Sequence, residues 1–151
     1  MIDVVAAIIG KNNKLLICQR AKGKHCELLW EFPGGKIESG ETPEEALVRE
    51  CKEELDVTIK PGNFLCKVEH EYPDITVNIH FYFCKITDGK PVCKEHHKIQ
   101  WSTRDEISKR TLCPADQKMW EAEYKTIDEF VQYNFAKQKY DEVVSENIHN
   151  F

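Results

Sequence analysis

The pattern of apolar and polar residues divides the chain into strands, one strong helix, more strands and a helical C-terminal part. Two apolar runs separated by the polar turn at 11–14 predict a β-hairpin near the N-terminus. A third extended segment is expected to stop at Pro33-Gly34-Gly35, where turn residues accumulate. The predicted strands cover residues 4–9, 15–18, 28–32, 64–72, 75–87 and 99–101.

The clearest helix signal covers residues 42–55. Thr42 can cap the helix, Pro43 suits its first position, and Glu45 completes a capping box with Thr42. Asp56 follows where glycine is the usual stop. Because aspartate tolerates the left-handed conformation better than most residues, we expect the helix to end there.

The C-terminal third is predicted to be helical. Thr103 and Glu106 form a second capping box, which predicts a short helix. From Pro114 onward, apolar residues recur near helical spacing until about Gln138, after which the pattern fades and the tail is expected to fray. We therefore expect a mixed sheet with helices on both faces, one domain over 1–138 and a tail over 139–151.

Composition narrows the function classes. The 151 residues fit one domain, with 41% apolar and 31% charged residues. The net charge of −5 and the absence of a basic stripe argue against nucleic-acid binding. No apolar run has membrane-spanning length, and the acidic, briefly apolar start of the sequence leads us to expect no signal peptide. The seven cysteines lack paired spacing, which favours reduced thiols, several in the core, in a cytoplasmic protein.

Three carboxylates stand on one face of the predicted helix, because Glu50, Glu53 and Glu54 occupy positions i, i+3 and i+4. Like charges at this spacing repel, and a bound cation is the usual reason to tolerate them. Oxygen ligands suit Mg²⁺ or Mn²⁺. An acidic face that is merely solvated is the simpler alternative. It leaves unexplained the glycine-rich turn, Glu41, the capping box and Arg49.

This segment resembles the Nudix box, G-x5-E-x7-R-E-U-x-E-E-x-G-U, in which U is apolar. Cys51 replaces the usual aliphatic residue and Asp56 replaces the last glycine. The resemblance to the MutT-type branch extends over about residues 2–120, including Gln19-Arg20, the 30–36 segment and Pro114-Ala115-Asp116. The box positions that match are Gly35, Glu41, Arg49, Glu50, Glu53, Glu54 and Val57.

The resemblance implies an α/β/α sandwich around a mixed sheet, with the box as a loop–helix–loop. Glu50, Glu53 and Glu54 would hold the metal ions together with the carbonyl oxygen of Gly34. Arg49 would orient the glutamates through charge-assisted hydrogen bonds.

Several residues around the box are further candidates. Glu41 would be a weak metal contact or a support of the site, and Gly35 and Lys36 are candidate substrate contacts. Glu95 is the candidate for an additional metal ligand or general base, although it could be an ordinary loop carboxylate. The neighbouring His96 and His97 are interpreted as loop residues.

The implied reaction is magnesium-dependent attack of water on a nucleoside triphosphate, giving a monophosphate and pyrophosphate. Arg20 is a candidate phosphate or base contact, or else a surface residue at a strand end. Asp116 is a candidate for reading the base edge. Alternatively, it is an acid that the helix dipole stabilises near a helix start, and the two interpretations are compatible. Tyr72 or Phe32 could stack on the base, or belong to the core.

The resemblance leaves the base open. It fits removal of oxidised nucleotides such as 8-oxo-dGTP, a DNA-repair function that sanitises the nucleotide pool, and it equally fits cleavage of CTP or modified cytosine nucleotides. A hydrolase of ADP-ribose or dinucleoside polyphosphates, and a binding module without catalysis, are the less favoured alternatives. We expect a monomer or homodimer.

Overall fold

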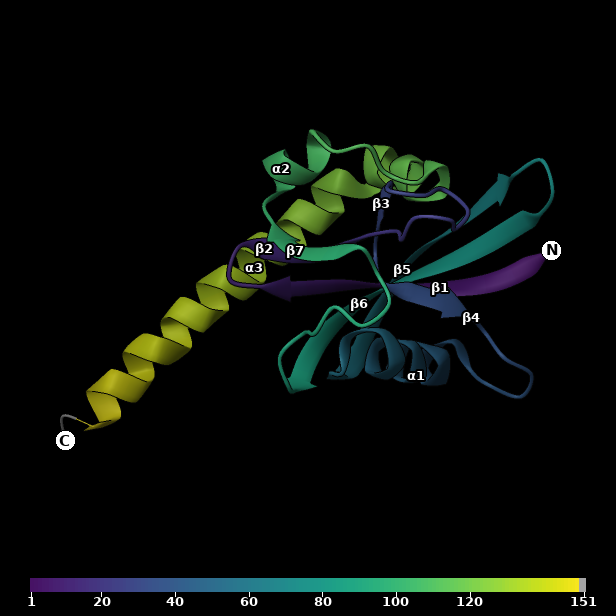
Figure 1. Cartoon of the computed structure of the whole chain (residues 1–151). Helices are drawn as coiled ribbons and strands as arrows, with labels where there is room; N and C mark the ends of the chain where they lie inside the picture. The colour runs from purple at the N-terminus through teal and green to yellow at the C-terminus, as the bar shows by residue number, and fades with distance from the viewer. Residues whose placement is uncertain (150–151) are drawn as a thin grey trace.

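A mixed β-sheet with helices on both faces forms the body of the computed structural model, which describes residues 1–149 (Figure 1). No described helix is long and apolar enough to cross a membrane. The elements in chain order are β1 (Ile2–Lys11), β2 (Lys14–Gln19), β3 (Trp30–Glu31), β4 (Gly34–Lys36), α1 (Pro43–Leu55), β5 (Thr58–Glu71), β6 (Thr76–Asp88), β7 (Lys98–Ser102), α2 (Arg104–Ser108) and α3 (Pro114–His149).

Strand β1 is the centre of the sheet. The strand order is β3-β2-β1-β6-β5, while β4 also pairs with β1 and β7 with β2. Strand β6 runs parallel to β1, and the other strand pairs are antiparallel. The sheet is therefore mixed, as predicted.

Each face of the sheet buries its own apolar cluster. Alternate residues of β1 point to opposite faces, so that Val5 contributes to the cluster under α1 and Ile8 to the cluster under α3. Leu47 contributes to the cluster under α1, and Met119 to the cluster under α3. This arrangement confirms the predicted sandwich.

Helix α1 begins and ends as its sequence predicts. The Thr42 side chain accepts a hydrogen bond from the N–H of Glu45, whose side chain accepts in turn from the N–H of Thr42. Asp56 closes the helix in the left-handed conformation, with φ 55° and ψ 39°. These local devices hold the acidic helix in a defined register above β1 and β4.

The segment after Pro33 differs from the prediction, in which the third strand ended there and a turn followed. Gly34–Lys36 instead forms β4, antiparallel to β1. A Cβ on Gly34 would collide with the backbone carbonyl of Val5, so this close approach requires glycine. In the local sequence, two adjacent glycines indicate a turn. In this fold, their lack of side chains instead allows an additional strand to pair with β1.

Helix α3 also extends further than its apolar pattern suggests. It passes residue 138 without a break and continues to His149, and its distal half projects from the body (Figure 1). The structure thus gives residues 139–149 of the predicted tail a helical conformation, and the last two positions of that tail lie outside the described residues.

The cysteines are free thiols throughout the described chain, and several lie in the core as predicted. Burial raises the pKa of the Cys18 and Cys51 thiols well above the usual value. Burial also raises the pKa of Cys84 to about 12. The buried cysteines are Cys18, Cys51, Cys84 and Cys113.

Two adjacent apolar residues of α1 test the packing. Leu47 is completely buried, whereas Val48 is 37% exposed. We expect Leu47→Ala to lower the free energy of unfolding by about 2–5 kcal/mol, because it leaves a cavity under the helix. Val48→Ala should change it by less than about 0.5 kcal/mol. Denaturant unfolding measures both, and equal losses would contradict this packing.

Candidate active site

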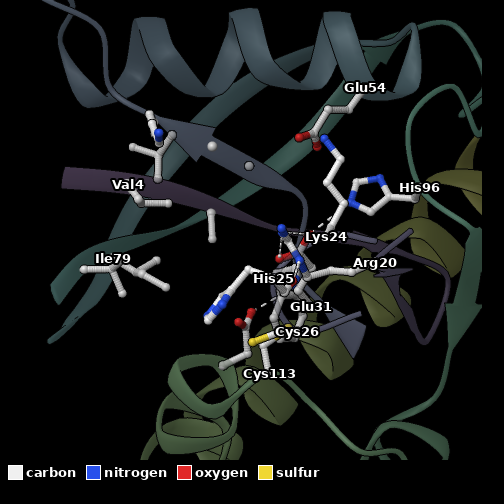
Figure 2. Close-up of a pocket in the computed structure, with 18 of the residues that line it drawn as sticks. Val4, Arg20, Lys24, His25, Cys26, Glu31, Glu54, Ile79, His96 and Cys113 are labelled. Atoms are coloured by element: carbon white, nitrogen blue, oxygen red, sulfur yellow. Dashed lines mark hydrogen bonds and ion pairs between the residues drawn. The ribbon is translucent and has the colours of Figure 1, made fainter. Parts of the chain in front are cut away.

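A cavity of about 810 Å³ lies between α1 and the start of α3 (Figure 2). Glu54 faces it from the side of α1, and Cys113 faces it from the opposite end. The predicted residues that line it are Arg20, Phe32, Gly34, Gly35, Lys36, Glu54, Tyr72, Glu95 and Asp116. Glu41, Arg49, Glu50 and Glu53 do not line it directly.

Arg49 joins the glycine-rich loop to the acidic helix. Its Nε donates to Glu41 at 2.6 Å and its Nη2 donates to the second Glu41 oxygen at 2.9 Å. Its Nη1 donates to Glu50 at 2.8 Å and to Glu53 at 3.3 Å, and Nη2 also reaches the Lys36 carbonyl oxygen at 2.9 Å. The bonds from Arg49 to Glu41, together with the Glu38 N–H, lower the pKa of Glu41 to about 2. Glu41 therefore holds Arg49 in place and does not line the cavity.

Glu50 lies against Gly35 at the edge of the cavity. A Cβ on Gly35 would overlap the Glu50 carboxyl group, so glycine is required for this contact. Burial, opposed by Arg49, raises the pKa of Glu50, and the charges of Glu53 and Glu95 raise it further. Glu50 is thus a carboxylate in a crowded acidic environment.

Glu54 is the most deeply buried carboxyl of the helix face. Only 8% of the residue is exposed, and its Oε2 atom has no hydrogen-bond partner. Burial, together with the charges of Glu31, Glu50 and Glu95, raises its pKa to about 9. A buried, unpartnered carboxylate is costly unless a proton or a cation occupies it.

Glu53 and Glu95 occupy more open positions. The Glu53 side chain is 53% exposed and contacts Arg49 at 3.3 Å, outside the residues that line the cavity but on the same helix face as Glu50. Glu95 lies on an exposed loop before β7 and lines the cavity. Its charge affects both Glu50 and Glu54, which places it near the pair.

The α1 end of the cavity fits a hard divalent cation. Its donors are carboxylate oxygens, and the Glu54 Oε2 atom lacks a partner. The opposite end has a different chemistry, although side-chain ligand atoms of Glu31, Cys113 and Asp116 lie within 4.8 Å of one another. There, hydrogen bonds from Arg20 and from the Phe32 N–H already engage the carboxylates. We therefore interpret the second cluster as a hydrogen-bonded acidic pair.

Asp116 lies in the first turn of α3 and is 4% exposed. Its Oδ1 accepts a hydrogen bond from the N–H of Phe32 at 3.0 Å. Burial and the charge of Glu31 raise its pKa to about 8. The carboxyl therefore holds a proton more readily than an ordinary aspartate, and the protonated form can donate as well as accept hydrogen bonds.

Glu31 organises the wall next to Asp116, a position that the sequence did not single out. Arg20 Nη1 contacts both Glu31 oxygens at 3.1 and 3.2 Å, and His96 Nε2 lies 3.0 Å from Oε2. His96 does lie in the loop before β7, as interpreted, but its side chain is only 6% exposed and lines the cavity. Glu31 could have been found from the sequence, because it is an acid between two large apolar residues, Trp30 and Phe32, that are typical of a buried strand. His96 had no such signal, since its partner is 65 residues away.

The aromatic candidates differ in their surroundings. Phe32 is 2% exposed and packs against Phe81 and Trp120, with ring centroids 6.5 and 6.2 Å away. Tyr72 is partly exposed and meets His25 edge-on at 4.5 Å. Phe32 thus belongs to the core behind the cavity, whereas Tyr72 presents a ring to it.

Comparisons with known proteins identify the family. The NUDIX domain model matches residues 4–122. The 8-oxo-dGTP diphosphatase of Escherichia coli is 36% identical over 75% of this chain and 88% of that protein. The CTP pyrophosphohydrolase of E. coli is 35% identical over 81% of this chain and 90% of that protein. The chain therefore belongs to the Nudix family and is a MutT-like hydrolase that acts on acid anhydrides.

Solved structures agree with this assignment. The solution structure of the E. coli ORF135 protein has a TM-score of 0.70 at 35% identity, covering 81% of this chain and 87% of that one. The MutT NUDIX hydrolase from Burkholderia pseudomallei has a TM-score of 0.73 at 26% identity, covering 80% and 95%.

The raised pKa values predict a link between pH, stability and magnesium. The folded chain keeps protons on Glu54 and Asp116 that the unfolded chain releases near its ordinary values of 4.5 and 3.8. The free energy of unfolding should therefore fall as pH rises from these values to about 9 and about 8. Denaturant unfolding across this window measures the fall.

Magnesium should oppose this loss, because a cation can replace the proton on Glu54. We expect Mg²⁺ to stabilise the protein more at the alkaline end of the window than at the acidic end. Glu54→Gln should weaken this pH-dependent stabilisation. Equal stabilisation by Mg²⁺ at both ends would contradict the role of Glu54.

Proposed function

We propose that this protein is a magnesium-dependent nucleoside triphosphate pyrophosphohydrolase that releases a nucleoside monophosphate and pyrophosphate. The observation that carries the proposal is the buried, unpartnered Glu54 oxygen, which faces a large cavity beside Glu50. Its preferred substrate class is oxidised deoxynucleoside triphosphates such as 8-oxo-dGTP. The similarity to the 8-oxo-dGTP diphosphatase of E. coli supports this choice.

The α1 end would bind the phosphate chain. Glu50, Glu53 and Glu54, together with the Gly34 carbonyl oxygen, would hold Mg²⁺, and Glu95 would join them as a ligand or base. The bound ion supplies charge neutralisation and a water of lowered pKa. Arg49 keeps the Glu50 carboxylate oriented through its hydrogen bond at 2.8 Å.

Cationic side chains would compensate the rest of the phosphate charge. Lys24 and Lys36 are exposed and line the cavity, and Arg20, the first residue after β2, lines it as well. Arg20 is already paired with Glu31, so its position is fixed before substrate arrives. The two lysines are better suited to follow a mobile phosphate chain, since long exposed side chains can move.

The α3 end would bind the base. In its protonated form, Asp116 can donate to a carbonyl oxygen and accept from an N–H group, and Glu31 adds an acceptor nearby. The base edge of 8-oxoguanine carries both kinds of group, including its additional N7–H. Tyr72 offers an aromatic surface next to this edge.

Hydrolysis of CTP or modified cytosine nucleotides is the second candidate. A relative named CTP pyrophosphohydrolase is 35% identical over 122 residues, nearly the same identity as the first. The exocyclic amine and ring nitrogen of cytosine also match an acid that both donates and accepts. A substrate panel with Mg²⁺ and product identification, including 8-oxo-dGTP, dGTP, dCTP, CTP and ADP-ribose, tests both candidates. Release of AMP from ADP-ribose alone would contradict both.

Glu53→Gln tests the metal assignment. We expect its turnover to fall by several orders of magnitude while the free energy of unfolding changes little, because the side chain is half exposed. Pyrophosphate release and denaturant unfolding measure the two effects. Glu44→Gln, an exposed change in the first turn of the same helix, is the matched control. Near-normal turnover in Glu53→Gln would rule out this residue as a ligand.

Asp116→Asn tests base selection. The amide keeps an acceptor for the Phe32 N–H but loses the ability to exist as an acid or an anion. We expect the order of kcat/KM values among the nucleotides to change more than the highest kcat. Asp74→Asn, elsewhere on the cavity wall, is the control. A uniform loss for every nucleotide would show that Asp116 does not read the base.

A further inference from the structure

The distal half of α3 is a feature that hydrolysis does not explain. The family model ends at residue 122, but the helix continues to His149 and leaves the body (Figure 1). Its proximal part is anchored by Ile127 and Val131 in the core and by Phe130, which stacks on Phe83 at 4.3 Å. Asn134 lies beside Gly10, where an added Cβ would come within 3.8 Å of its side-chain nitrogen.

An apolar seam runs along the outer side of this distal half. Tyr133, Ala136, Tyr140 and Val143 follow each other at steps of three and four, which is the spacing of a coiled-coil stripe. At 100° per residue, this stripe lies opposite the side of the helix that carries Val131 into the core. Tyr133 is 67% exposed, Tyr140 68% and Val143 54%.

An isolated helix with such a seam is marginally stable in water. Single helices of this length gain most of their stability from packing an apolar face. Each tyrosine can bury about 150–250 Å² when covered. The small Ala136 between two tyrosines gives the stripe the alternation of large and small side chains that allows another helix to interdigitate.

The charges beside the seam indicate which occupant fits. Lys137 and Lys139 lie in its first half, whereas Asp141, Glu142 and Glu146 lie in its second half. An antiparallel helix of the same sequence would bring each basic half to an acidic half. A parallel copy would align like charges with like charges.

We propose that a second copy of this chain covers the seam as an antiparallel pair of α3 helices. The two chains then use the same surface, which gives a closed, twofold symmetric dimer. Tyr140 of each chain packs beside Val143 of the other, and Lys139 of each lies near Glu146 of the other. Asn147, next in the heptad pattern, is a polar residue of the kind that fixes register.

The dimer is expected to depend on protein concentration, because a seam of this length is at the small end of specific interfaces. Sedimentation of the full chain over the micromolar to millimolar range measures the dissociation constant. Tyr140→Glu places two negative charges at the centre of the seam and should raise that constant roughly a hundredfold. Ser145→Glu, which lies on the other side of the helix, should leave it nearly unchanged.

Controls keep this test separate from folding and from hydrolysis. Far-UV circular dichroism reports whether each variant keeps its helix, and pyrophosphate release should be unchanged in both, since the seam is remote from the cavity. A wild-type chain that stays monomeric over the whole range overturns the proposal. A dimer that survives Tyr140→Glu with the same dissociation constant also overturns it.

A charge exchange tests the antiparallel direction. Lys139→Glu and Glu146→Lys should each raise the dissociation constant roughly tenfold, because two attractive pairs become repulsive. The double variant should return it close to the wild-type value. Single variants without effect, or a double variant without recovery, would overturn the antiparallel arrangement.

Discussion

The guanidinium group of Arg49 is the interaction on which the acidic site depends. Without it, Glu41, Glu50 and Glu53 would repel one another across a few ångströms. Its fork of donors holds both oxygens of Glu41 and one oxygen of Glu50, and it reaches the Lys36 carbonyl as well. One side chain thereby joins the loop after β4 to α1 and fixes the carboxylates before any cation arrives.

The two ends of the cavity use carboxyl groups in different ways. At α1, one oxygen of Glu54 is buried without a hydrogen-bond partner, so the charged form needs an external cation. At α3, Asp116 and Glu31 find partners within the protein, namely the Phe32 N–H, Arg20 and His96. Burial raises the pKa of both Glu54 and Asp116, but only the first invites a metal ion. The same functional group, a buried carboxyl, therefore suits phosphate binding at one end and base recognition at the other.

Features with local causes could be predicted from the sequence. The capping box of Thr42, the left-handed Asp56 and the shared face of Glu50, Glu53 and Glu54 depend on residues a few positions apart. Family resemblance then added Arg49 and Glu41. The pairing of β4 with β1 could not be predicted from neighbouring residues. Gly34 is typical of a turn in the local sequence, and only its contact with the distant Val5 carbonyl shows why a strand needs glycine there. The His96 contact with Glu31 likewise exists only after the chain has folded.

The burial of most thiols has a consequence for a chain expected to work among oxidised nucleotides. Peroxide reacts with thiolates far faster than with thiols, and a raised pKa keeps Cys18, Cys51 and Cys113 protonated. Cys93 is the exposed exception, on the loop near Glu95. The buried thiols of the domain can thus stay reduced during the oxidative stress that creates the damaged nucleotides.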